Sequence, residues 1–147
     1  MIGLSPTISR ATATSIRAKA AEVAFGQSLV TNNLRGLVAE TIVASILGPE
    51  WQWCSADWAG WDFERNDGLR LEVKQSASRQ TWASSNGKPS KCRFDIKARQ
   101  GRYEGADWHP GHGRNADLFV MAHHFVSDDA ADHCAPEQWR FFVLPET

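Results

Sequence analysis

The stretch of sequence that decides the fold runs from Trp61 to Gln75 and reads WDFERNDGLRLEVKQ. Its centre, Asn66-Asp67-Gly68, has the composition of a three-residue hairpin loop, in which a type I turn is followed by a left-handed glycine. On either side of this loop, apolar and polar residues alternate, as they do in a half-buried β-strand. The stretch therefore predicts an antiparallel β-hairpin.

The length of the loop determines which residues of the hairpin face one another. A three-residue loop gives four cross-strand pairs: Arg65 with Leu69, Glu64 with Arg70, Phe63 with Leu71, and Asp62 with Glu72. The Glu64–Arg70 pair is predicted to be an ion pair, and the apolar face is predicted to hold Trp61, Phe63, Leu71 and Val73. A two-residue Asp67-Gly68 turn would instead place Asp62 opposite Val73, and is the weaker alternative.

The predicted hairpin brings two carboxylates together beside a lysine. Directly opposed residues have Cβ atoms about 5 Å apart, and like charges at that separation are destabilising unless something compensates them. A Mg²⁺ ion between Asp62 and Glu72 is the natural compensation, because it prefers carboxylate oxygens. Lys74 lies two residues after Glu72, so strand alternation places both on one face. Three such groups can hold a metal and direct a cation at a water molecule.

A third carboxylate, Glu40, lies in a predicted helix upstream of the hairpin. The helix runs from about Leu34 to Leu47, with Thr31–Asn33 as candidate caps and Gly48-Pro49 as the stop. Glu40 is the only charged residue between Arg35 and Glu50, and its neighbours one turn away are apolar or small. Burying an unpaired carboxylate is costly. Glu40 is therefore expected either to join the metal site or to reach solvent or Arg35 from the helix edge.

The rest of the chain is predicted to alternate between short elements and polar loops. An N-terminal helix is expected from Ser5-Pro6 to about Ala24, with an apolar stripe of Ile16, Ala20, Val23 and Ala24. The predicted strands are Trp51–Cys54, Gly60–Glu64, Leu69–Gln75, Arg93–Lys97, Leu118–Phe125 and Trp139–Leu144. The predicted loops are Ser76–Pro89, the glycine-rich Gln100–Asn115 and the acidic, exposed Ser127–Ala135.

Length and composition indicate one ordinary globular domain spanning residues 1–147, with residues 1–30 as a possible accessory or dimerisation element. The chain has 42% hydrophobic and 22% charged residues, and no apolar run long enough to span a membrane. Three widely spaced cysteines suggest no disulfide framework, so a cytoplasmic location is expected. The seven tryptophans are more consistent with core and strand packing than with base stacking.

The charge is distributed unevenly along the chain. From Arg65 to Arg102 there are ten Lys or Arg against three Asp or Glu, a net charge of +7, whereas the rest of the chain carries −8. Such a basic segment around the carboxylates is where a polyanion would lie, although a solvated basic loop has the same composition. The candidate phosphate contacts are Arg79, Lys88, Lys91, Arg93, Lys97, Arg99 and Arg102.

Taken together, Glu40, Asp62 and the run Glu72-Val73-Lys74-Gln75 resemble the PD-(D/E)xK nuclease superfamily. The resemblance covers roughly Asn33 to Gln75 by motif and the last two predicted strands by general pattern. Gly60-Trp61 stands where the motif has a proline before its aspartate. The resemblance implies an α/β protein with a restriction-endonuclease-like core, in which helices flank a central mixed β-sheet.

The resemblance also implies a function, namely Mg²⁺-dependent hydrolysis of phosphodiester bonds in DNA, with Mn²⁺ as a possible substitute. The implied metal ligands are Asp62, Glu72, the Val73 carbonyl and Glu40, and Lys74 would orient or deprotonate the attacking water. Gln75 is a weaker catalytic candidate, supported by similar ExKQ patterns among relatives. Nucleases of this size often form homodimers.

Two other classes of function remain open from the sequence. A protein with this fold could bind nucleic acid or a protein partner without cleaving, although a binding module does not need opposed carboxylates. An unrelated structural or zinc-stabilised domain is the third possibility, with His109, His112, His133 and Cys134 as candidate zinc ligands. His123-His124 lies in a predicted strand and is expected to be structural.

Overall fold

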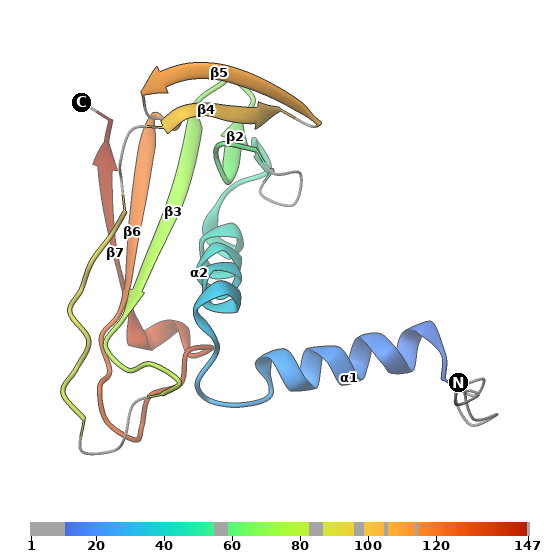
Figure 1. Cartoon of the computed structure of the whole chain (residues 1–147), viewed down its shortest axis with the longest axis vertical. Helices are drawn as coiled ribbons and strands as arrows, with labels where there is room; N and C mark the ends of the chain where they lie inside the picture. Colours follow the sequence, from blue (N-terminus) through green and yellow to red (C-terminus); the bar gives the residue numbers. More distant parts are fainter. Residues whose placement is uncertain are drawn as a thin grey trace, which may run out of the picture.

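The protein is an α/β protein built on a five-stranded mixed sheet (Figure 1). The computed structural model describes residues 11–54, 59–82, 87–95, 99–104, 106–113 and 115–146. Its elements in chain order are α1 (Ala13–Phe25), α2 (Asn32–Ile46), β1 (Trp51–Trp53), β2 (Phe63–Arg65), β3 (Arg70–Ala77), β4 (Arg99–Glu104), β5 (Asp107–Gly113), β6 (Leu118–His124), the short 3₁₀ helix η3 (Pro136–Gln138) and β7 (Trp139–Pro145).

The main sheet has the strand order β1-β2-β3-β6-β7. Strands β3 and β6 are parallel, with Glu72 beside Phe119 and Lys74 beside Met121, and the other neighbours are antiparallel. Strands β4 and β5 form a separate antiparallel hairpin, which lies across one end of the main sheet in Figure 1. Neither described helix is long and apolar enough to cross a membrane.

Helix α2 covers one face of the sheet, because its apolar side chains recur at helical spacing. Val38 and Ala39 pack with Ala122 and Trp139, and one turn later Val43 packs with a group on the central strands comprising Phe63, Leu71 and Val120. On the opposite face, Trp61 packs with Ala116, Phe119 and Met121, and Phe94 lies against this cluster. Strand β6 is thus packed with apolar side chains on both faces, whereas β3 is apolar on the α2 face and carries Glu72 and Lys74 on the other.

The structure confirms the predicted helix over residues 34–47 and corrects the prediction for the N-terminus. The sequence predicted a helix starting at Ser5, but Ala11 and Thr12 are non-helical because Thr12 caps α1 through a reciprocal pair of hydrogen bonds with Ser15. Residues 1–10 lie outside the described part of the chain. The predicted apolar stripe of α1 is not buried, since α1 has no buried residue.

The hairpin register confirms most of the prediction, and its loop is the expected three-residue one. Gly68 has a φ of 89°, and its N–H donates to the Arg65 carbonyl. Phe63 pairs with Leu71 and Glu64 with Arg70, whose side chains form an ion pair at 3.7 Å. The regular ladder ends at this point. Phe63 pairs with Leu71, and the Asp62 N–H also donates to the Leu71 carbonyl, so two residues of one strand oppose a single residue of the other. This irregularity turns Trp61 to the face opposite Phe63, which contradicts the predicted shared apolar face.

Three predicted loops and one predicted strand differ from the structure. Strand β3 runs on to Ala77, and Ser76 to Gln80 are buried rather than looped in solvent. The glycine-rich segment 100–115 contains most of the β4–β5 hairpin. Lys91–Asp95 form no strand, and the remainder of that predicted strand lies outside the described residues. In the acidic segment 127–135, Ala131 and His133 are buried. The loop predictions rested on the glycine and polar content of these segments. Strand pairing and burial in the folded protein outweigh those local preferences.

A buried polar network joins α2 to the end of β3. Arg35 is 1% exposed, and its guanidinium donates to Gln75 Oε1 at 2.7 Å, to Gln80 Oε1 at 3.0 Å, to Asn32 Oδ1 at 2.9 Å and to the Val30 carbonyl. These acceptors are all neutral, and burial lowers the pKa of Arg35. The network holds the N-terminus of α2 on the strand that carries Lys74.

We expect Arg35→Met to destabilise the fold by about 3 kcal/mol, because it leaves several buried acceptors without their donor. Denaturant unfolding followed by tryptophan fluorescence measures the effect. Arg65→Met is the matched control, since Arg65 pairs with Asp67 on the surface. Equal midpoints for the two variants would show that the Arg35 network does not contribute to stability.

Candidate active site

Asp62 lies where β1, β2 and β3 meet, and its backbone is fixed from two sides. Its N–H donates to the Leu71 carbonyl at 2.9 Å, and its carbonyl accepts from the Cys54 N–H at 2.7 Å. The side chain of Asp62 then takes over where the β2–β3 ladder ends, since Oδ2 accepts from the Val73 N–H at 2.7 Å. The sequence predicted that Asp62 lies directly opposite Glu72. This prediction is wrong, because the backbone N–H of Asp62 bonds to Leu71 and its side chain to the Val73 N–H.

The Val73 carbonyl points toward Asp62, at the edge of β3 that faces β2. In a β-strand the N–H and C=O of one residue point to the same side, and the Val73 N–H points at Asp62. Glu72 and Lys74 flank Val73 and extend from one face of β3, as strand alternation predicted. Their side chains form an ion pair at 2.5 Å and are 23% and 19% exposed.

Glu40 approaches the same strand edge from α2, on the other side of the sheet. The indole Nε1–H of Trp53 donates to Glu40 Oε2 at 3.0 Å, and the Trp53 ring stacks on Phe63 with centroids 5.4 Å apart. Arg35, the alternative neighbour considered from the sequence, donates to neutral groups instead. Sequence reasoning missed Trp53, although a carboxylate in an apolar helix signals that a donor is needed nearby.

The electrostatics of Asp62 show that the acidic groups act on one another. Burial is the largest cause that raises its pKa, and the charge of Glu40 follows, with a smaller contribution from Glu72. The Val73 N–H and the Lys74 ammonium act in the opposite direction, and the resulting pKa is about 7. A carboxyl that is this crowded is stabilised by either a proton or a cation.

Gln75 lies on the α2 side of β3 and belongs to the buried network, not to the carboxylate cluster. Its Oε1 accepts from Arg35, and its Nε2 donates to the side chain and carbonyl of Asn32. Among the site residues considered from the sequence, Glu40, Glu72 and Lys74 lie close enough to Asp62 to act on its charge, and Val73 bonds it directly, whereas Gln75 belongs to the Arg35 network.

The basic residues fall into three groups. Lys88, Lys91 and Arg93 are exposed on a segment that Phe94 anchors to the cluster of Trp61, Phe119 and Met121, which is the face carrying Glu72 and Lys74. Arg79 is buried and bonded to Asp129 at 2.9 Å. Lys97 lies outside the described residues, and Arg99 and Arg102 lie in β4.

The donor chemistry of this cluster fits a hard divalent cation. The candidate ligands are carboxylate and carbonyl oxygens, which Mg²⁺ prefers, and the raised pKa of Asp62 records negative charge that a cation would relieve. In the described part of the chain, no three His, Cys, Asp or Glu residues already form a metal-binding group. Asp62, Glu40 and Glu72 of the described structure interact electrostatically without being gathered into one ligand set, and Glu72 is bonded to Lys74.

Comparison with protein-family models, with curated proteins and with solved structures found no match.

Proposed function

We propose that the protein is a divalent-metal-dependent nuclease that hydrolyses phosphodiester bonds in DNA, with a restriction-endonuclease-like core. The observation that carries this proposal is that Asp62 lies near Glu40 and the Glu72–Lys74 pair, and that burial, followed by the charges of Glu40 and Glu72, raises the pKa of Asp62 to about 7. A buried acidic group with a strongly perturbed pKa beside a lysine is typical of catalytic sites.

In this proposal the cation is held by Asp62, Glu72 and the Val73 carbonyl, with Glu40 binding its water shell or a second ion. When bound, Mg²⁺ polarises the scissile phosphate and lowers the pKa of a coordinated water. The Val73 N–H holds Asp62 in place, and its hydrogen bond of 2.7 Å leaves the second carboxylate oxygen for a ligand.

Lys74 orients the attacking water and offsets negative charge that develops on the phosphate. In this structure the Lys74 ammonium is bonded to Glu72. To reach the water it has to break that ion pair, or keep it while also contacting the water. A cation held by Glu72 would supply the charge compensation that Lys74 now gives this carboxylate, and Lys74 would then be available to the water.

A DNA substrate fits the distribution of positive charge around this site. The exposed side chains of Lys88, Lys91 and Arg93 lie on a segment that crosses the face of Glu72 and Lys74. We propose these three residues as backbone phosphate contacts, which position the duplex without reading its sequence. Lys97, Arg99 and Arg102 stay candidates, and the ion-paired Arg79 is better explained as structural.

The test is cleavage of supercoiled plasmid, of branched DNA and of single-stranded DNA, each with Mg²⁺ or Mn²⁺ and with EDTA as the control. Metal-dependent nicking or linearisation by the wild type supports the proposal. If all three substrates stay intact while the protein binds DNA in a gel-shift assay, the protein is a nuclease-fold binding protein that does not cleave. The closed Glu72–Lys74 ion pair favours that second function.

We expect Trp53→Phe to raise the Mg²⁺ concentration needed for half-maximal cleavage by about 10-fold, the lower end of what loss of a hydrogen-bond partner to a metal ligand costs. The substitution keeps the ring that stacks on Phe63 but removes the donor to Glu40. Metal titration of cleavage measures it. Trp51→Phe is the control, because Trp51 lies under Arg65, and an equal effect of both substitutions would contradict the role of Trp53.

A further inference from the structure

Helix α1 carries an apolar stripe that no described residue covers. Ile16, Ala20 and Val23 lie at helical spacing on one side, and Ile16 and Val23 are 58% and 74% exposed. With 13 residues, α1 is about as short as the shortest helices that persist alone in water. Figure 1 shows α1 running away from the body of the protein. Among the described residues the stripe therefore has no packing partner of the kind that such a helix needs.

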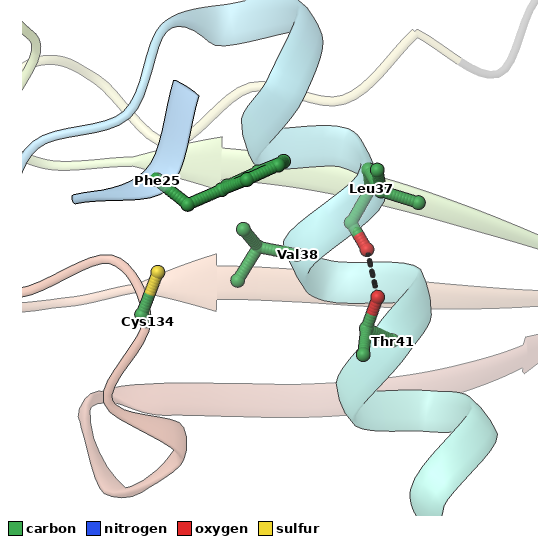
Figure 2. A pocket seen from close by; sticks show the side chains of 5 residues that line it. All are labelled: Phe25, Leu37, Val38, Thr41 and Cys134. Carbon is green, nitrogen blue, oxygen red and sulfur yellow. Dashed lines mark hydrogen bonds between the residues drawn. The ribbon is translucent and has the colours of Figure 1, made fainter. Parts of the chain in front are cut away.

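An apolar groove lies beside the C-terminal end of α1. It has a volume of about 330 Å³ and is lined by Phe25, Leu37, Val38, Thr41 and Cys134. Figure 2 shows these side chains around a common space, with the Thr41 hydroxyl bonded to the Leu37 carbonyl at 2.7 Å. Because that hydroxyl is satisfied within α2, the groove is suited to an aliphatic side chain.

The groove of a given molecule is not placed to receive the stripe of the same α1. Phe25, which lines the groove, follows Ile16 by nine residues, and at 3.6 residues per turn these two positions lie on opposite sides of the helix. When Phe25 contacts its own groove, Ile16 and Val23 must face outward. The stripe therefore needs a groove from elsewhere.

The charges beside the stripe and beside the groove are complementary. The stripe is flanked by Arg17 and Lys19, and Lys19 pairs with Glu22. Cys134 belongs to the acidic segment Ser127–Ala135, which also contains Asp128, Asp129 and Asp132. Arg79 neutralises only one of these three acids. Helix α1 carries Arg17, Lys19 and Glu22, a net charge of +1, and is therefore attracted to the acidic segment that contributes Cys134 to the groove.

We propose that the occupant of the groove is α1 of a second copy of this chain. Because one chain carries both the stripe and the groove, a twofold axis makes the contact twice. A contact between two α1 helices alone is too small, since each is only about 20 Å long and a stable interface buries about 800 Å² on each side. When α1 of each copy lies in the groove of the other, the interface also includes α2 and the acidic segment of both copies.

The first test is the mass of the full-length protein in solution, measured by sedimentation velocity at tens of micromolar. The wild type is expected to be a dimer, and Val23→Lys and Leu37→Lys are expected to be monomers with unchanged helical circular dichroism. Ile46→Lys is the matched control, because Ile46 is 76% exposed in α2 but does not line the groove, and it should stay dimeric. A monomeric wild type overturns the proposal, as does a dimer that Ile46→Lys also disrupts.

The second test does not depend on disrupting the interface. Val23→Cys is combined with Cys54→Ser and Cys92→Ser, which leaves Cys134 in the groove as the only other thiol. Mild oxidation is expected to give a covalent dimer on a non-reducing gel. A monomer without free thiols would show that α1 folds back onto its own groove, and no crosslinking at all would show that the groove does not receive α1. Either result overturns the proposal, whether or not the protein cleaves DNA.

Discussion

Lys74→Ala is expected to reduce metal-dependent cleavage of plasmid DNA by at least about 100-fold, the lower end of what a positioned proton-transfer group contributes. The reason is geometric and electrostatic. Lys74 lies on the same face of β3 as Glu72, contacts its carboxylate at 2.5 Å and lowers the pKa of Asp62. Initial rates at saturating DNA and metal, for wild type and variant, measure the loss.

Two comparisons separate a chemical role of Lys74 from other effects of its removal. Lys91→Ala removes an exposed basic residue that we assign to phosphate contact, so it should weaken DNA binding several-fold and leave the rate at saturating DNA nearly unchanged. Thermal unfolding of both variants checks that the fold is intact. If Lys74→Ala retains more than a third of the wild-type rate at saturation, Lys74 takes no part in the proposed chemistry.

The sequence predicted the hairpin and its charged residues because a short loop restricts the register strongly. Asn66-Asp67-Gly68 permits few backbone geometries, so the Glu64–Arg70 pair followed from loop length alone. The position of Asp62 did not follow, because a one-residue irregularity in a strand leaves no clear mark in the pattern of side chains. That irregularity matters for the site, since it exchanges a direct cross-strand contact for the hydrogen bond from Val73 to Asp62.

The elements that sequence reasoning missed carry no clear local signal in the sequence. The β4–β5 hairpin lies in a glycine-rich segment with weak strand propensity, and it forms because Tyr103 pairs with Trp108 and Arg102 with His109 across it. The burial of His133 likewise depends on residue 30, whose N–H donates to its Nδ1 at 2.8 Å. No local pattern around His133 could indicate a partner more than a hundred residues away.

Asp62→Asn is expected to stabilise the fold at pH 8 by about 3 kcal/mol while abolishing cleavage. The folded protein raises the pKa of Asp62 from its ordinary 3.8 to about 7. A carboxyl with a raised pKa contributes stability that is fully present below pH 3.8 and is lost as the pH rises through 7. Asparagine carries no charge and can still accept the Val73 N–H, so it removes the cost of burying a charge and the repulsion from Glu40 and Glu72 without losing the hydrogen bond.

The expected signature is a difference in unfolding free energy between Asp62→Asn and wild type that grows from pH 4 to pH 8. The difference isolates Asp62, because His133 contributes equally in both proteins. Burial lowers the pKa of His133 to about 4, so the contribution of His133 to stability increases as the pH rises, opposite to that of Asp62. Millimolar Mg²⁺ should stabilise the wild type and not the variant, since a ligand stabilises only the state that binds it. Chemical denaturation at several pH values, with and without Mg²⁺, measures both effects.

Asp67→Asn is the matched control for this prediction, because it is the same substitution in the same hairpin with the opposite electrostatics. The Arg65 side chain lowers the pKa of Asp67 to about 2, so Asp67 favours folding above pH 3.8 and loses that contribution as the pH falls through 2. Its replacement should not stabilise the protein at pH 8. If Asp62→Asn also fails to stabilise, the three carboxylates do not repel one another. The clustered negative charge proposed to attract a metal would then be absent, and cleavage would have to arise elsewhere in the molecule.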